Sequence, residues 1–295
     1  MVLKQIDNIY WSKFTTLLEM IKFSHTVFAL PFALMGAVLA SLANNRPPTV
    51  GQIFWICLAM AGARTVAMGL NRIIDARIDA HNPRTAERHI PAGKVSYLEA
   101  WGLVGSALFL LLFSAWMLNP LCLKLAPIAV GFLVLYSFCK RFTSLAHIVL
   151  GICLAAAPLG AWIALRGSIG WPAIGLALAV LLWVSGFDVF YSLQDVEFDK
   201  SQGLHSIPVW VGVEKAIIIV RFLHVGMMVL LFNLLFTPGL GWIYLSGLLV
   251  ISAMLVYEHM LVRPDDLSKL DAAFFNMNGY ISVTIFLFTL ADALF

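Results

Sequence analysis

Long runs of apolar residues recur along this chain of 295 residues. A helix needs about 20 mostly apolar residues to cross a bilayer, and backbone polar groups inside lipid must bond within their own segment. Each run is therefore predicted to be a transmembrane helix, and together they predict an all-α membrane protein with one domain over residues 1–295. The nine predicted spans are 26–43, 51–71, 98–118, 120–138, 145–165, 171–194, 216–236, 240–262 and 272–294.

The composition excludes a soluble globular protein. Hydrophobic residues make up 61% of the chain and charged residues 12%, whereas soluble domains have roughly 45–50% apolar and about 25% charged residues. The mean hydropathy is +0.90. The formal net charge of +3 does not indicate nucleic-acid binding, because the basic residues are gathered in a few loops.

This distribution of basic residues predicts the topology. Fifteen of the 19 Lys and Arg lie on one side, in the N-terminal segment and in the loops after residues 71, 138, 194 and 262. The positive-inside rule places that side in the cytoplasm. We therefore expect a multi-pass protein of a bacterial-type inner membrane, with its N-terminus and its long polar loops in the cytoplasm.

Two clusters of aspartates lie at the cytoplasmic ends of the spans 51–71 and 171–194. In each cluster the residues follow one another at helical spacing and share one helix face. Carboxylates at membrane depth cost roughly 2.5–3.5 kcal/mol each, so such stripes indicate a function. The first cluster is Asn71, Asp75 and Asp79, and the second is Asp188, Asp195 and Asp199, with Tyr191 in the same stripe.

Magnesium is the natural partner of two such clusters. Mg²⁺ prefers oxygen ligands and is typically held by one or two carboxylates together with substrate phosphates. The six Asn and Asp residues are therefore predicted to bind Mg²⁺ in a central cavity that opens to the cytoplasm, where the metal would neutralise a diphosphate leaving group. The residues expected to act in catalysis are Asp75, Asp79, Asp195 and Asp199.

Basic residues beside the clusters are candidates for contacts with a diphosphate. Arg88, Lys140 and Arg141 lie on the same side of the membrane as the aspartates. Arg binds phosphate oxygens through two donors and Lys acts as a point charge. The alternative for any one of them is that it only sets the topology.

The histidines and cysteines do not indicate a second metal site. The four cysteines form no CxxC pair, and the histidines have no spacing typical of metal ligands. Most of the histidines are expected to form local hydrogen bonds. Those considered are His25, His81, His89, His147 and His205.

The two aspartate clusters and their flanking segments resemble motifs of the UbiA prenyltransferase superfamily. Its NDxxDxxxD motif is similar to Asn71–Asp79, and its DxxYxxxDxxxD motif to residues 188–199. The segment 84–93, RTAERHIPAG, resembles the loop after the first motif. Residues 136–145, YSFCKRFTSL, are similar to a segment of 4-hydroxybenzoate polyprenyltransferases. The resemblance covers nearly the whole chain.

Two departures bear on the acceptor. Arg72 stands where the first motif usually has an acidic residue. In the first span, Lys22 and His25 stand where 4-hydroxybenzoate enzymes have Arg and Lys, and this segment resembles a branch acting on a naphthoate in menaquinone biosynthesis. The acceptor implied is therefore 4-hydroxybenzoate or a dihydroxynaphthoate.

The resemblance implies an Mg²⁺-dependent transfer of a polyprenyl group from its diphosphate to an aromatic acid, in quinone biosynthesis and with no obligate protein partner. Tyr136 or Tyr191 would stabilise the allylic cation. Ser137 would hydrogen-bond the acceptor, and Arg64 or Lys22 would bind its carboxylate.

Two other classes of membrane protein share some of these features. Aspartates within spans also occur in transporters, which often have broken helices near the bilayer midplane. Here the clusters lie at helix ends beside basic loops, which favours a phosphate site. A CDP-alcohol phosphotransferase would need a glycine and a spacing that Asp75–Arg77 lacks.

Overall fold

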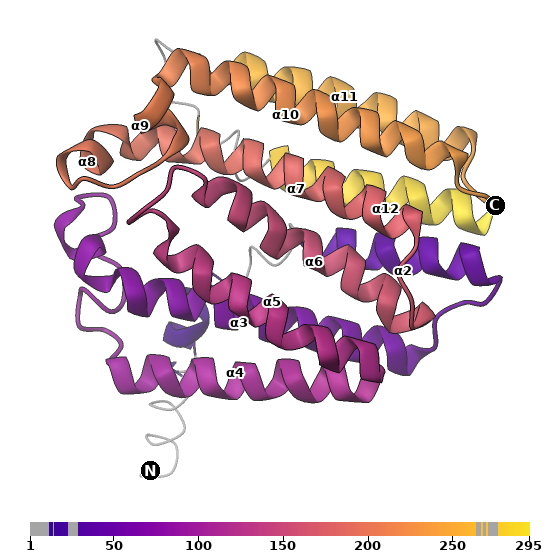
Figure 1. Cartoon of the computed structure of the whole chain (residues 1–295), viewed down its shortest axis with the longest axis horizontal. Coiled ribbons are helices and arrows are strands. Elements are labelled where there is room, and N and C mark those ends of the chain that lie inside the picture. The colour runs from indigo at the N-terminus through magenta and orange to yellow at the C-terminus, as the bar shows by residue number, and fades with distance from the viewer. Residues whose placement is uncertain (1–11, 14, 23–28, 264–266, 268–269, 271–276) are drawn as a thin grey trace.

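The structure is a computed structural model, and it describes residues 12–13, 15–22, 29–263, 267, 270 and 277–295. His25 lies outside these residues. The described part of the chain is helical and contains no β-strand (Figure 1). Its helices are α2 (Leu30–Asn44), α3 (Val50–His81), α4 (Tyr97–Leu118), α5 (Pro120–Cys139), α6 (Ala146–Arg166), α7 (Trp171–Ser192), η2 (Leu193–Asp195), α8 (Val196–Ser201), α9 (Ile207–Val211), α10 (Val213–Asn233), η3 (Leu234–Phe236), α11 (Trp242–Leu261) and α12 (Asn278–Leu294).

Seven helices, counted in the described ranges, are long and apolar enough to cross a membrane. They are α3, α4, α5, α6, α7 continued by α8, α10 continued by η3, and α11. The spans predicted at 26–43 and 272–294 correspond to α2 and α12, which have 15 and 17 residues. The all-α membrane fold is thus confirmed, and the count of nine spans stays a prediction.

Helix α3 is longer than the sequence predicts. It has 32 residues and ends at His81, ten residues beyond the predicted end. Thr49 begins it with a capping box, in which its hydroxyl accepts from the backbone of Gln52 and the Gln52 side chain accepts in return. The shared helix face expected for Asn71, Asp75 and Asp79 is present, because α3 runs unbroken through all three. The first cluster therefore lies on one rigid element.

Helix α7 is the central helix of the bundle. Its apolar window is 72% buried, against 17–39% for the other candidate spans. It packs against α6 and α10, and α6 comes so close at Gly151 that an added Cβ would lie 2.6 Å from the carbonyl oxygen of Leu181. Small residues allow such close approach between membrane helices. Asp188 is therefore carried by the most firmly packed helix. The other two aspartates of the second cluster lie beyond its end, Asp195 in the 3₁₀ turn Leu193–Asp195 and Asp199 in α8.

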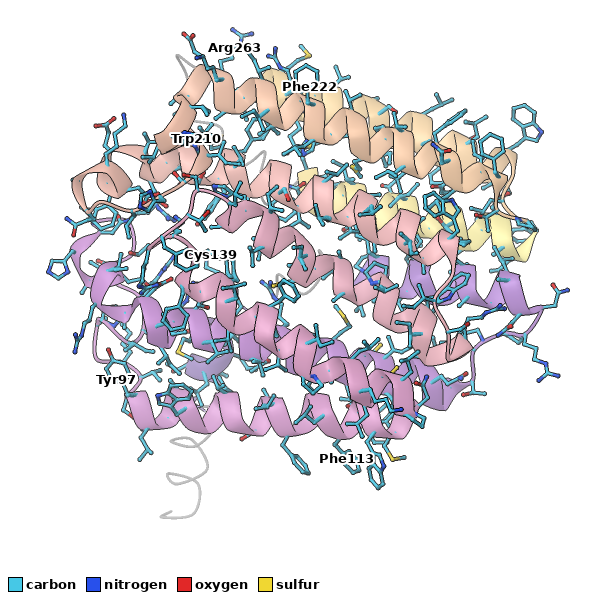
Figure 2. All side chains as sticks on the ribbon, viewed as in Figure 1. Tyr97, Phe113, Cys139, Trp210, Phe222 and Arg263 are labelled. Atoms are coloured by element: carbon cyan, nitrogen blue, oxygen red, sulfur yellow. The ribbon has the colours of Figure 1, made fainter. Side chains whose placement is uncertain are left out.

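Large apolar side chains cover the outside of the bundle. Phe222 is 74% exposed and Phe109 is 69% exposed. Figure 2 shows Phe222 and Phe113 pointing away from the helices that carry them. A water-soluble monomer rarely exposes so much contiguous apolar surface, whereas lipid tails match it. The short helices α8 and α9 lie at the end of the bundle where α4 begins (Figure 1).

Candidate active site

One cavity of about 630 Å³ contains both aspartate clusters in its wall. Its wall on α3 runs from Ile56 to Asp79, which is roughly 35 Å at the helical rise of about 1.5 Å per residue. One end is polar and the rest is apolar. All six residues expected to bind a metal line the polar end: Asn71, Asp75, Asp79, Asp188, Asp195 and Asp199.

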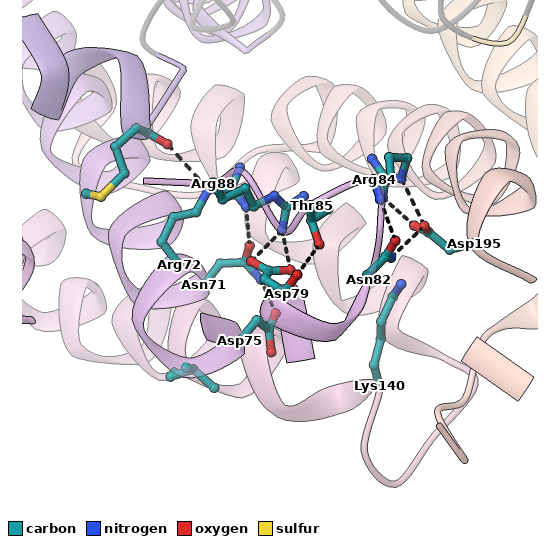
Figure 3. Close-up of polar contacts among 12 residues, drawn as sticks. Asn71, Arg72, Asp75, Asp79, Asn82, Arg84, Thr85, Arg88, Lys140 and Asp195 are labelled. Carbon is teal, nitrogen blue, oxygen red and sulfur yellow. Dashed lines mark hydrogen bonds and ion pairs between the residues drawn. The ribbon is translucent and has the colours of Figure 1, made fainter. Parts of the chain in front are cut away.

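The first cluster is held by two arginines from outside α3, Arg141 and Arg88; Figure 3 shows Arg88 beside Asp79. Asn71 donates to Asp75 over 2.7 Å, and Arg141 donates to the other oxygen of Asp75 over 2.9 Å. Arg88 contacts both oxygens of Asp79, at 2.6 and 2.7 Å. Two of the three basic residues expected to bind phosphate therefore lie directly against the aspartates.

The second cluster is bound by the loop that follows α3 (Figure 3). Arg84 donates to both oxygens of Asp195, with Nε at 2.9 Å from Oδ1, and Asn82 donates to the same Oδ1 over 3.1 Å. Arg84 also donates to the Tyr191 hydroxyl over 2.7 Å. Burial lowers the pKa of Arg84, but the hydrogen bonds to Asp195 outweigh this and the pKa is raised, so the guanidinium stays charged.

Sequence reasoning did not assign these two loop residues to the site. Asn82 gave no signal, because a single Asn after a helix is ordinary. Arg84 belongs to the basic residues that follow the first cluster and begins the family-like segment 84–93, but it was not among the residues expected to contact the diphosphate. That segment was the available signal, since it places two arginines within a turn of each other beside the first cluster.

The remaining two aspartates have different partners. Lys140 lies 3.4 Å from Asp199. Nδ1 of His147 lies 2.7 Å from Asp188, which is 41 residues away in the chain. His81 does form the expected local bond, with its Nδ1 donating to the carbonyl oxygen of Arg77 over 2.8 Å, whereas the partner of His147 is distant in the sequence.

The residues expected to contact the organic substrates also line the cavity. The Nε of Arg64 and the hydroxyl of Ser137 are buried without a hydrogen-bond partner among the described residues. Arg64 lies seven residues before Asn71 on α3, which places it about 10 Å deeper. Tyr136 and Lys22 are further parts of the wall.

Arg72, which replaces an acidic residue of the family motif, does not point at the aspartates as a free cation. Its side chain is buried. Nε donates to the carbonyl oxygen of Met20 over 3.3 Å, and Nη1 donates to the Asn71 side chain over 3.3 Å. Arg72 therefore ties the N-terminal segment to α3 and orients the amide of Asn71.

The donor set fits Mg²⁺ that is bound together with a phosphate group. In the described part of the chain, no three His, Cys, Asp or Glu side chains are grouped closely enough to hold a metal by themselves. Mg²⁺ usually keeps several waters and takes only one or two carboxylates, with phosphate oxygens completing its shell. At its polar end the cavity wall offers the oxygen atoms of five aspartates and of Asn71 and Asn82, with basic side chains beside them.

Comparison with known proteins places these features in a family. A family model described as the UbiA prenyltransferase family matches residues 29–280. The 4-hydroxybenzoate octaprenyltransferase of Vibrio campbellii is 28% identical over 249 residues, covering 83% of this chain and 85% of that protein. The 4-hydroxybenzoate octaprenyltransferase of Salmonella newport is 29% identical over 243 residues, covering 81% and 83%.

Solved structures show the same fold. A UbiA homolog from Aeropyrum pernix K1 aligns with a TM-score of 0.82 and 31% identity, covering 91% of this chain and 98% of that one. A UbiA homolog from Archaeoglobus fulgidus bound to DMAPP and Mg²⁺ aligns with a TM-score of 0.70 and 18% identity, covering 95% and 99%.

Proposed function

The chain belongs to the UbiA prenyltransferase family, and on that premise we propose that it transfers a polyprenyl group from polyprenyl diphosphate to an aromatic acid with Mg²⁺. The observation that carries the proposal is the shared cavity. Two clusters of oxygen ligands line its polar end, with basic side chains beside them. The rest of the cavity, the apolar body, leads away from that end.

At the polar end the chain's own residues would bind the diphosphate and its metal. When bound, Mg²⁺ supplies the positive charge that stabilises the leaving diphosphate. Arg88, Lys140 and Arg141 donate to phosphate oxygens, and so does Arg84, which the structure adds to the set. Arg84, Arg88 and Lys140 lie in the cavity wall, and Arg141 contacts Asp75, which also lines it. The four side chains are 24–35% exposed, so a change of rotamer would move each donor from a carboxylate to a phosphate. The metal ligands proposed are Asn71, Asp75, Asp79, Asp188, Asp195 and Asp199.

The apolar body suits a long prenyl tail. Small residues from several helices line it, among them Ala63, Ala129, Ala156 and Gly160. Small side chains leave room where larger ones would close the space between helices. The apolar part of the wall on α3, from Ile56 to Met68, extends roughly 18 Å at the helical rise, which favours a donor of several prenyl units over the shortest one.

The acceptor would lie between the diphosphate and Arg64. The Nε of Arg64 is buried without a hydrogen-bond partner among the described residues, and a carboxylate is the best partner for a guanidinium inside a membrane protein. Ser137 offers an unused hydroxyl nearby in the same wall, and Lys22 is a second candidate for the carboxylate. Tyr136 and Tyr191 face the cavity where the allylic cation would form.

The ring attack then follows from this placement. The C–O bond of the donor breaks and the diphosphate leaves with the bonding electrons. The electron-rich ring carbon beside a phenolic hydroxyl bonds to the allylic carbon, and loss of the ring proton restores aromaticity. Both 4-hydroxybenzoate and a dihydroxynaphthoate provide such a carbon and a carboxylate. The relatives' names favour 4-hydroxybenzoate, and the Lys22 segment favours the naphthoate.

We also propose that the polar end faces the cytoplasm, as the positive-inside rule requires. A transporter is less well supported, because the helix break at Leu193–Asp195 lies at the end of α7 and not at its middle.

The test is an assay of purified protein in detergent with a labelled polyprenyl diphosphate and each aromatic acid in turn. We expect a prenylated acid, identified by mass, in the presence of Mg²⁺. EDTA should stop its formation and added Mg²⁺ should restore it. Full activity after exhaustive chelation, or no product with either class of acid, would contradict the proposal.

A further inference from the structure

Asp188 differs from the other four aspartates in the kind of partner that holds it. The others pair with Arg or Lys side chains that are 24–35% exposed. Asp188 is 16% exposed and pairs with His147, whose side chain is 0% exposed. The Arg and Lys partners can turn toward a bound phosphate, whereas His147 cannot leave its place without opening the helix packing around it.

The hydrogen bonds of His147 determine which ring nitrogen carries the proton. The backbone N–H of Ile207 points at Nε2 over 3.4 Å. Because a backbone N–H can only donate, Nε2 must present its lone pair. The hydrogen of the neutral ring is then on Nδ1, which donates to Oδ2 of Asp188 over 2.7 Å.

The backbone of His147 is also fixed. It lies in the first turn of α6, and its carbonyl oxygen accepts from the Ser185 hydroxyl of α7 over 3.2 Å. One turn later, Gly151 has no room for a Cβ, which would lie 2.6 Å from the same hydroxyl oxygen. The imidazole is therefore held by α6, α7 and the start of α9 at once.

From this geometry we infer that His147 is a positioning residue: it holds Oδ2 of Asp188 so that the other carboxylate oxygen stays aimed at the metal and diphosphate. The inference rests on the proposed function. Hydrogen bonds to metal-binding groups from such supporting residues orient the ligands, and their loss typically weakens metal affinity by about 10–100-fold. The alternative is an ordinary buried histidine that only fills space.

The experiment measures Mn²⁺ binding to the purified protein by electron paramagnetic resonance, with a non-reactive prenyl thiodiphosphate present. His147→Leu should bind Mn²⁺ about 10–100-fold more weakly than wild type. His147→Gln should stay within about 3-fold, because its amide also offers one donor and one acceptor. His224→Leu removes another buried histidine, whose partner is His259 and not an aspartate, and it should leave Mn²⁺ affinity unchanged.

A double-mutant cycle separates positioning from packing. In an Asp188→Asn background, His147→Leu should change Mn²⁺ affinity by no more than about 2-fold. An equal loss in both backgrounds would show that His147 acts through packing and would overturn the inference. If His147→Leu does not fold, His147→Ala takes its place: it has no donor for Asp188, so equal binding by the Ala and Gln variants would also overturn the inference.

The experiment distinguishes failure of the proposed function from failure of the positioning role of His147. Absence of Mn²⁺ binding in wild type contradicts the proposed function. Tight binding in wild type and equally tight binding in His147→Leu leaves that function standing and removes only the role of His147.

Discussion

The polar end and the apolar body of the cavity differ in how their side chains are held. At the polar end, each aspartate has its own partner, such as Arg84 for Asp195 and Arg88 for Asp79. In the apolar body, alanines and leucines from the five helices α3 to α7 form the wall together with Gly160, and these residues have no polar side-chain group to pair. The polar end therefore depends on the chemistry of single side chains, and the body depends only on the space that its side chains leave.

The physical reason lies in the cost of burying charge. Removing one member of a buried ion pair leaves the other uncompensated, which costs more than the pair contributes. Removing or adding a methyl group in an apolar wall changes only contacts and volume. Substitutions at the polar end are thus expected to change turnover, and substitutions in the body to change which donor fits.

The largest effect is expected for the aspartates. Asp75→Asn and Asp195→Asn each remove a metal ligand and leave an arginine without its counter-ion, so product formation at saturating Mg²⁺ should fall by about 10³-fold. The Asn side chain keeps the volume, and size-exclusion chromatography should show an unchanged elution profile. Glu197→Gln is the control, because that side chain is 93% exposed and off the stripe. Wild-type turnover in either Asp variant would contradict the expectation that substitutions at the polar end reduce turnover.

The next effect concerns Arg64, which lies between the two ends. Arg64→Met should raise KM for the aromatic acid by about 10–100-fold, because a charged hydrogen bond is lost. The KM for polyprenyl diphosphate should not change. Arg64→Lys keeps the charge and should recover part of the loss. A rise in KM for the diphosphate instead would assign Arg64 to the phosphate region.

Arg84 should have a smaller effect, because Asn82 still holds Asp195 when the guanidinium is gone. Arg84→Met should raise KM for polyprenyl diphosphate by about 10-fold, the size expected for one charge-assisted contact. Arg77→Met is the matched control: Arg77 is exposed near the end of α3, the helix that precedes the loop with Arg84. Equal effects of the two substitutions would mean that only the total positive charge matters.

The smallest effect on overall turnover is expected in the apolar body. An added Cβ at Gly160 meets no atom within 4 Å, and Gly160 lines the cavity. Gly160→Leu should keep activity with short donors within about 3-fold and disfavour the longest donors by about 10-fold, as overpacking predicts. Gly131→Leu has the same free space but lies outside the cavity wall, so its preference for donor length should match wild type. Competition between a short and a long labelled donor measures the donor-length preference of each variant.

Much of the polar end could be predicted from the sequence because its signals are local. Asn71, Asp75 and Asp79 share a face through their spacing alone, and α3 is continuous through all three. The partners of these residues could not be predicted in the same way. Arg84 bonds to a residue 111 positions away and His147 to one 41 positions away, and no spacing rule links such pairs.

The apolar body was the least accessible to sequence reasoning. A run of alanines and glycines in a membrane helix is compatible with close packing against a neighbour or with the wall of a cavity. Gly151 and Gly160 lie on the same helix, yet the first touches α7 and the second faces open space. Only the arrangement of the neighbouring helices distinguishes them.

By itself, the sequence determined that this chain is helical, belongs in a membrane and carries two acidic stripes, because hydrophobicity and helical period act over a few turns. The tertiary structure decided which cation faces which carboxylate, that a histidine holds Asp188, and where the space for a long apolar chain lies. Those features depend on distances between helices, and such distances are set by packing across the whole bundle.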